Sequence, residues 1–158
     1  MQTLYMHEMP KSTPPSKSLA SDARSAIENC PVWNARLAAR RVTQFLAQRL
    51  EVAGLSVAQF GLMAQVAAAT DDSLGALAER AGLDPSTLSR NLQVLERDGL
   101  VEIATGERDT RRRAVWLTEP GCARLEAALV VWREAHAELA RRIDVEAVLR
   151  AAKATEGL

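Results

Sequence analysis

Polar side chains in the middle of this 158-residue chain have the types and spacing needed to recognise nucleic acid. If residues 85–98 form a helix, Leu88, Leu92 and Leu95 share one face and must be buried. The opposite face then carries hydroxyl, amide and guanidinium groups, which can hydrogen-bond to base edges and phosphates in a DNA major groove. The residues that we expect to contact DNA from this helix are Ser86, Thr87, Ser89, Arg90, Gln93 and Arg97.

Two of these side chains have a preferred base. The planar guanidinium of Arg90 could donate two hydrogen bonds to guanine, and the amide of Gln93 could pair with adenine. A polar helix face that is only solvated would have the same composition, so this assignment depends on the neighbouring elements.

A second basic cluster follows at residues 106–113, where four arginines face two acids. The flanking segments 100–105 and 114–118 alternate with a period of two, which predicts a β-hairpin with this polar loop at its tip. A basic tip suits a narrow minor groove, whose negative potential attracts arginine. Asp109 could orient Arg111 through a charge-assisted hydrogen bond. The expected DNA contacts at the tip are Arg108, Asp109, Arg111, Arg112 and Arg113.

The elements before this hairpin have clear boundary signals. Residues 73–81 read as a short helix ended by Gly82, and Asp84-Pro85 restarts the chain as an N-cap followed by a proline at the first helical position. Gly99 ends the second helix. Helix, tight turn, helix and hairpin together predict a winged helix-turn-helix module.

Helices are also expected on both sides of this module. Residues 1–18 read as a disordered or docking arm, and 19–54 as helices split at Pro31. Ser56 and Gln59 form a capping box for the next helix. A long helix over about 120–142 and a last one capped by Asp144 complete the chain. The face expected to be buried in the helix after Ser56 consists of Val57, Phe60, Met63, Ala64 and Ala67.

These boundaries give a mainly α fold with a small β-hairpin wing. The expected organisation is an arm (1–18), N-terminal dimerisation helices (19–54), the winged module (55–118) and C-terminal dimerisation helices (119–158). The 28 alanines and the 4% aromatic content agree with a helix-rich chain.

Composition excludes several classes of protein. No run approaches the roughly 18–20 apolar residues of a membrane span, and no signal peptide is visible, so we expect a cytoplasmic protein. Cys30 and Cys122 are too few for a disulfide framework, and His7 and His136 are isolated, so neither a metal nor another cofactor is expected. No nucleophile–base pair, metal motif or phosphate loop is present, so we expect no enzyme activity.

The charge distribution sets a constraint on DNA binding. Twenty basic and twenty acidic residues cancel, and residues 72–118 contain seven arginines against eight acids. The winged module is therefore not basic as a whole. Its affinity for DNA must come from where individual arginines are placed.

Six short motifs follow one another along the chain: residues 55–60 (LSVAQF), 77–83 (LAERAGL), 85–90 (PSTLSR), 95–101 (LERDGLV), 109–111 (DTR) and 117–121 (LTEPG). Through these motifs the chain, from Cys30 to Arg142, resembles the MarR family of transcriptional regulators. This resemblance implies a two-fold dimer formed by the first and last helices, pseudo-palindromic operators, and control by a ligand or an oxidant from a crevice between the dimer and DNA modules.

The terminal helices hold more apolar surface than the small winged module can cover, which also favours a homodimer. We expect Leu129 and Trp132 to lie on the dimer side of the long C-terminal helix. The other apolar residues counted toward this excess are Leu19, Ile27, Leu37, Leu46, Val130, Ile143 and Leu149.

Two kinds of switch remain open at this stage. Peroxide-sensing relatives carry a reactive cysteine near the start of the first main helix, which makes Cys30 a redox candidate, although aligning Arg40 and Gln59 with the family places Val32 at the sensing position. The chain also lacks the tyrosines of those sensors, since its only tyrosine is Tyr5. The alternative is a small aromatic or phenolic effector held by apolar walls and arginines. The residues considered for such a site are Trp33, Arg36, Arg40, Phe60, Met63 and Trp116.

The prediction is a sequence-specific DNA-binding regulator of the repressor type. It would act as a homodimer on a pseudo-palindromic stretch of double-stranded DNA, and a small aromatic or phenolic ligand would release it. One alternative is an oxidant-sensing repressor that uses Cys30. The other is a non-enzymatic helical module for protein interaction.

Overall fold

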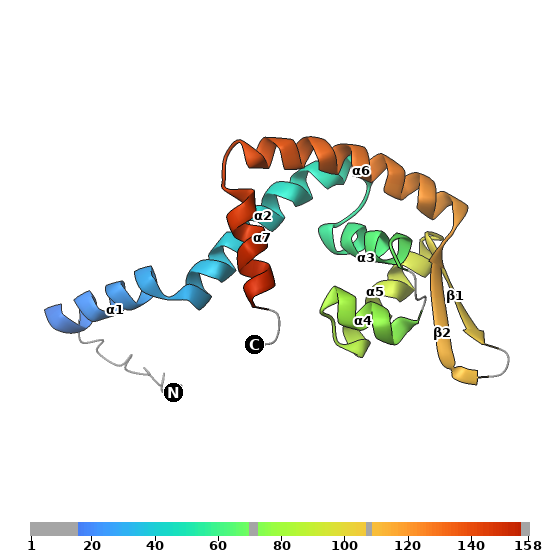
Figure 1. The fold of residues 1–158 in the computed structure, drawn as a ribbon, viewed down its shortest axis with the longest axis horizontal. Coiled ribbons are helices and arrows are strands. Elements are labelled where there is room, and N and C mark those ends of the chain that lie inside the picture. Colours follow the sequence, from blue (N-terminus) through green and yellow to red (C-terminus); the bar gives the residue numbers. More distant parts are fainter. Residues whose placement is uncertain (1–15, 70–72, 107–108, 156–158) are drawn as a thin grey trace, which may run out of the picture. The chain divides into compact units, whose positions relative to one another are not determined.

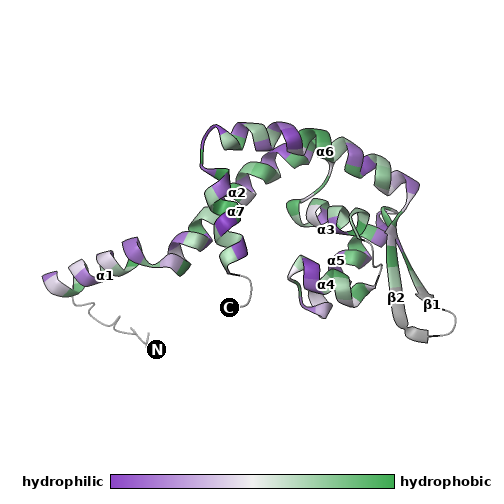
Figure 2. Cartoon of the chain, viewed as in Figure 1, coloured by the Kyte–Doolittle hydropathy of each residue, from purple (hydrophilic) through white to green (hydrophobic). Residues whose placement is uncertain are grey.

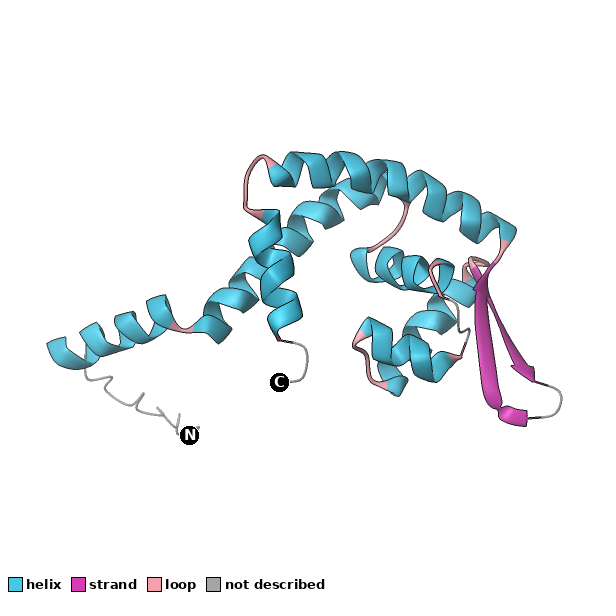
Figure 3. Ribbon diagram, viewed as in Figure 1, coloured by secondary structure: helices cyan, strands magenta, loops and turns pink. Residues whose placement is uncertain are grey.

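The computed structural model describes residues 16–69, 73–106 and 109–155, with only the backbone given for 105–106 and 109–113. It confirms a mainly α fold with one antiparallel hairpin in the described residues (Figures 1 and 3). The elements in chain order are α1 (Lys17–Asn29), α2 (Pro31–Leu50), the short 3-10 helix η1 (Glu51–Ala53), α3 (Val57–Ala67), α4 (Leu74–Ala81), α5 (Pro85–Arg97), β1 (Val101–Gly106), β2 (Asp109–Leu117), α6 (Glu119–Ala140) and α7 (Val145–Ala154).

The chain divides into two compact units, residues 1–41 and 42–158, and α2 runs from the first into the second. In the first unit, α1 begins at Lys17, two residues earlier than predicted, because the Ser16 hydroxyl caps it by accepting the backbone N–H of Leu19 at 3.2 Å. The predicted break at Pro31 is confirmed, since this proline is the first residue of α2. A proline suits that position because its missing N–H would have no helical partner there. Most of the predicted arm, residues 1–15, lies outside the described residues.

The predicted helix boundaries in the second unit are confirmed by their caps. Ser56 and Gln59 form the expected capping box at the start of α3, and Thr118 and Asp144 cap α6 and α7. Gly82, which ends α4, has a φ of 61°, a left-handed conformation that glycine adopts without steric cost. These are local signals, which explains why they could be read from the sequence.

The hydrophobic core of the second unit lies where α3, α4, α5 and α6 meet the hairpin (Figure 2). Leu77 on α4 and the three leucines of α5 are at most 2% exposed. The predicted face of α3 was too narrow: Phe60 and Met63 are buried, but Ala67 is exposed, and Leu62 and Val66 are buried instead. The reason is that α3 contacts α4, α5, α6 and β2, so more than one stripe of this helix is covered.

The hairpin differs from the prediction at its tip. Residues 109–113, expected in the loop, belong to β2, which pairs with β1 from Val101↔Leu117 to Gly106↔Asp109 with an irregularity between Thr105 and Gly106. A further bridge joins Ser73 to Ala114 and so ties the start of α4 to the wing. Within this part of β2, Asp109 and Arg113 pair with Gly106 and Thr105, and residues 110–112 lie in the irregularity between them.

The C-terminal half of α2 is joined to α6 by an ion pair. The Arg49 guanidinium donates to Oε2 of Glu138 through Nε at 3.1 Å and Nη2 at 2.7 Å, and it stacks on the Phe45 ring at 3.4 Å. Arg142 also pairs with Glu138. The hydrogen bond from Arg49, followed by the charges of Arg142 and Arg49, holds the pKa of Glu138 below its ordinary value. The Glu138 carboxylate therefore links the two helices as an anion.

The helices and side chains of the described residues also bear on membrane insertion and on metal binding. No single helix there is long and apolar enough to cross a membrane, although one pair bent by 76°, residues 31–53 with 57–67, meets the criteria of length and composition. The same residues contain no group of three or more His, Cys, Asp or Glu side chains that could hold a metal ion.

The start of α6 gives a test of the packing. Gly121 is buried, and a Cβ built on it would lie 1.9 Å from the carbonyl oxygen of Leu100. Because that atom is backbone, we expect Gly121→Ala to lower the free energy of unfolding by at least about 2 kcal/mol. Gly61, inside α3, has open space around its Cβ position. Gly61→Ala should therefore raise stability by about 0.5–1 kcal/mol. Urea unfolding of both variants is the measurement, and equal stabilities would contradict the packing of α6 on Leu100.

Candidate nucleic-acid interface

Helices α4 and α5 form a helix-turn-helix in which α5 has two distinct faces. Leu88, Leu92 and Leu95 are 2%, 0% and 0% exposed, which confirms that this face is core. Asp84 begins α5 as the N-cap, with Pro85 at its first turn. The polar face therefore points away from the core because the leucines fix the rotation of the helix.

The polar residues predicted on α5 lie where DNA could reach them. Ser86, Arg90, Gln93 and Arg97 are exposed and follow one another at spacings of four, three and four residues, so they form one strip along the helix. Arg97 makes only a 3.7 Å ion pair with Asp98, and its side chain remains 75% exposed. Thr87 and Ser89 are half-buried at the edges of this strip.

Asp84, predicted from the sequence only as a helix cap, lies beside the first residues of this strip. Its Oδ1 accepts the backbone N–H groups of Ser86 and Thr87, each at 3.0 Å. The Ser86 and Thr87 hydroxyls also donate to its two carboxylate oxygens, at 2.5 Å and 2.6 Å. These hydrogen bonds, that of the Ser86 hydroxyl first, hold the pKa of Asp84 well below its ordinary value. An ionised carboxylate thus lies at the N-terminal end of the strip. In helix-turn-helix proteins, the N-terminal residues of the second helix are the ones that contact base edges. The sequence feature that could have revealed these hydrogen bonds is Asp-Pro-Ser-Thr, which places two hydroxyl groups within reach of one N-cap carboxylate.

The wing carries the second predicted cluster. Arg108 lies outside the described residues, and for Asp109, Arg111, Arg112 and Arg113 the structure gives the backbone, which forms the first part of β2. The chain thus holds four of these five charged residues on the strand that returns from the tip to the core. Their roles at the DNA remain predictions.

The six residues considered for an effector have different environments. Phe60 and Met63 are 8% and 0% exposed in the core, where they act as packing. Trp116 alternates with the buried Val115 along β2, so its side chain lies on the opposite face of the hairpin and is 39% exposed. These three residues therefore have different surroundings in the structure, and their part in an effector site stays a prediction. The remaining three, in the first unit, line one hollow of about 80 Å³ together with Leu37: Trp33, Arg36 and Arg40.

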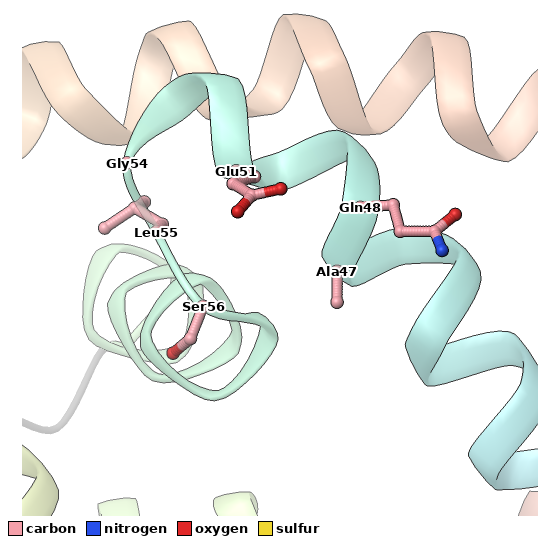
Figure 4. Close-up of a pocket in the computed structure, with 6 residues that line it drawn as sticks. All are labelled: Ala47, Gln48, Glu51, Gly54, Leu55 and Ser56. Atoms are coloured by element: carbon pink, nitrogen blue, oxygen red, sulfur yellow. The ribbon is translucent and has the colours of Figure 1, made fainter.

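A different hollow lies where α2 leads into α3 (Figure 4). It has a volume of about 390 Å³, is open to solvent, and contains none of the predicted effector residues. Its only charged lining residue is Glu51, which would repel a carboxylate ligand. This hollow therefore does not suit an aromatic acid. Its lining consists of Ala47, Gln48, Glu51, Gly54, Leu55 and Ser56.

An apolar groove of about 270 Å³ runs between α2, α6 and α7 within the second unit. Helix α7 has no buried residue, and its Val148 and Leu149, which line the groove, are 46% and 49% exposed. Leu129 and Trp132, expected on the dimer side, are half-buried and pack against the core of their own chain, and Trp132 also lines this groove. Their place in a dimer interface stays a prediction. Exposed large apolar side chains lie on α7 and also on α1, α2 and α6, where they include Leu19, Trp33 and Val130.

The two cysteines have different settings. Cys30 is partly buried and ends α1, and its carbonyl accepts the backbone N–H of Asn34 at 3.1 Å and the Asn34 side-chain amide at 2.9 Å. Cys122 is exposed near the start of α6. Both are free thiols, which an oxidant sensor requires. The oxidant-sensing alternative for Cys30 stays a prediction.

Comparisons with known proteins agree with this geometry. A family model described as the MarR family matches residues 53–112, which include α3, the helix-turn-helix and β1. The comparison with curated protein sequences finds no match.

Solved structures give a wider match. A crystal structure of the M. tuberculosis transcriptional regulator MosR in complex with DNA is 33% identical, covers 80% of this chain and 98% of that chain, and has a TM-score of 0.68. The transcriptional repressor CouR bound to a 23-mer DNA duplex is 21% identical over 93% of this chain and all of that chain, with a TM-score of 0.71. A cysteine-to-serine mutant of E. coli MarR with operator DNA is 23% identical over 84% of this chain and 98% of that chain, with a TM-score of 0.72.

The last two similarities concern the fold, whereas the similarity to MosR, at 33% identity over most of both chains, concerns the family. Together with the family match over the helix-turn-helix, it agrees with the polar strip on α5 and the wing that follows it. The chain belongs to the MarR family of DNA-binding transcriptional regulators.

Proposed function

We propose that this protein is a transcriptional repressor that binds a pseudo-palindromic operator as a homodimer. The observation that carries the proposal is the exposed strip of Ser86, Arg90, Gln93 and Arg97 on α5, opposite a leucine face that is at most 2% exposed. A helix held in this way can enter a major groove without losing its packing. The description of the similar protein CouR as a repressor favours repression over activation.

The homodimer is supported by the apolar surface on α7. One copy exposes Val148, Leu149 and Ile143 beside the apolar groove, and a second copy could cover them. A two-fold dimer presents two α5 helices and two wings, which doubles the number of arginines at the DNA. This doubling helps a chain of net charge zero to bind a polyanion.

We further propose that a small aromatic or phenolic ligand releases the protein from DNA. The Trp33 ring and the guanidinium groups of Arg36 and Arg40 line the same hollow, so they offer both stacking and carboxylate recognition. Its volume of about 80 Å³ accommodates only part of such a ligand.

The first prediction concerns base recognition by Arg90. We expect Arg90→Lys to keep the affinity for non-specific DNA but to lose the preference at one base pair of each half-site by about tenfold, because lysine keeps the charge and lacks the planar fork. The measurement is a gel-shift titration against single base-pair variants of the selected operator. A uniform loss over all variants would mark Arg90 as a phosphate contact.

The second prediction concerns the wing. Arg111→Ala should weaken binding to all sequences and reduce the slope of log affinity against log salt concentration by about 1 for each wing, since one phosphate or groove contact is lost. The matched control is Arg133→Ala, which removes an exposed arginine from α6. Equal salt slopes for the two variants would refute a DNA contact by Arg111.

The third prediction concerns the dimer. Leu149→Asp places a charge in the apolar groove, and we expect it to weaken dimerisation by about 100-fold or more because an unpaired charge in a dry interface costs several kcal/mol. Ala147→Asp adds the same charge to an exposed position of α7 that does not line the groove. Sedimentation velocity beside gel shifts distinguishes them. A fully dimeric Leu149→Asp variant would move the interface away from α7.

A further inference from the structure

The two hydroxyl groups at the start of α5 are already committed as hydrogen-bond donors. Ser86 Oγ lies 2.5 Å from Oδ1 of Asp84, and Thr87 Oγ1 lies 2.6 Å from Oδ2. A carboxylate can only accept hydrogen bonds, so each hydroxyl must direct its single proton at Asp84. What these hydroxyls can offer to a DNA base is therefore their oxygen lone pairs.

The backbone donors of this turn are also occupied. The N–H groups of Ser86 and Thr87 both point at Oδ1 of Asp84, at 3.0 Å. A phosphate usually binds a helix start through such N–H groups, but here the chain's own carboxylate has taken that position. The exposed carboxylate would in addition repel a phosphate. The first turn of α5 is consequently poorly suited to bind a phosphate group, which leaves contacts with DNA bases to be considered.

The position of Ser86 in the polar strip suggests such a base contact. It is exposed and lies one helical turn before Arg90, so in a major groove it would face a base pair close to the one that Arg90 contacts. Guanine and thymine present only acceptors or a methyl group there, whereas adenine N6 and cytosine N4 carry amino groups that donate. An acceptor-only hydroxyl matches the amino groups.

We propose that Asp84 is a specificity-determining positioning residue, which fixes the Ser86 and Thr87 hydroxyls as acceptors so that the first turn of α5 selects adenine or cytosine on the strand that it faces. This inference rests on the proposed function of α5 as an operator reader. It adds a base preference that neither side chain would have alone, since a free hydroxyl can donate as well as accept.

The most direct variant is Asp84→Gly. Glycine is among the residues accepted at helix N-caps. It removes both carboxylate oxygens, so the Ser86 and Thr87 hydroxyls each keep a proton that they can donate to a base acceptor. Ser86→Ala and Thr87→Val remove one hydroxyl each and leave the Asp84 carboxylate and the backbone hydrogen bonds of the cap in place. Circular dichroism during thermal unfolding checks that all three variants keep the fold.

The experiment selects operators for the full-length protein from a duplex library with randomised bases, and then measures gel shifts against every single base-pair variant at fixed salt. For the unmodified protein we expect adenine or cytosine to be preferred over guanine and thymine by about fivefold or more at one position of each half-site. Asp84→Gly should reduce this ratio to about twofold or less, and at least one of the hydroxyl variants should do the same. The preference at the position contacted by Arg90 should stay unchanged.

Two results would overturn the inference while leaving the proposed function intact. One is an Asp84→Gly variant with the full set of preferences of the unmodified protein. The other is a preference for guanine or thymine at the position that Ser86→Ala or Thr87→Val disturbs. If the unmodified protein selects no operator at all, the proposed function fails and the inference fails with it. The Arg90→Lys variant separates these cases, because its loss of base preference depends only on α5 reading DNA.

Discussion

The burial of one leucine face on α5 is the constraint on which the interface depends. Leu88, Leu92 and Leu95 pack against α3, α4 and β1, and each buried leucine contributes roughly 1.5–3 kcal/mol to stability. Rotating α5 about its axis would expose all three. The same packing that stabilises the winged module therefore fixes which side chains of α5 face outward, and the recognition strip needs no further support to keep its orientation.

Charge placement explains how a neutral chain can present a DNA-binding surface. In the helices that flank the winged module, Arg49 and Arg142 are paired with Glu138, and this pairing joins α2 to α6. On α5, Arg90 and Arg97 are exposed. The net charge counts the arginines that are paired with acids together with those that are exposed on α5. It therefore does not indicate how many arginines are free to contact DNA.

Local signals made much of the fold predictable. Ser56, Asp84, Thr118 and Asp144 cap helices through hydrogen bonds to residues two or three positions away, so the information needed lies within one turn. The polar strip on α5 was predictable for the same reason, because the helical period alone separates it from the leucines. The effector residues were not, since whether Phe60 or Trp116 lines a pocket depends on which elements pack beside it.

The sequence by itself determined the order of the elements, the face of α5 that is buried and the resemblance to the MarR family, because these follow from spacing and short motifs. Only the tertiary structure decided the wide buried surface of α3, the extension of β2 to Asp109 and the packing of Leu129 and Trp132 against their own chain. It also decided the pairing of Arg49 with Glu138, residues that are 89 positions apart. Such contacts depend on how separate elements approach one another, and the periodicity of a single segment contains no information about its neighbours.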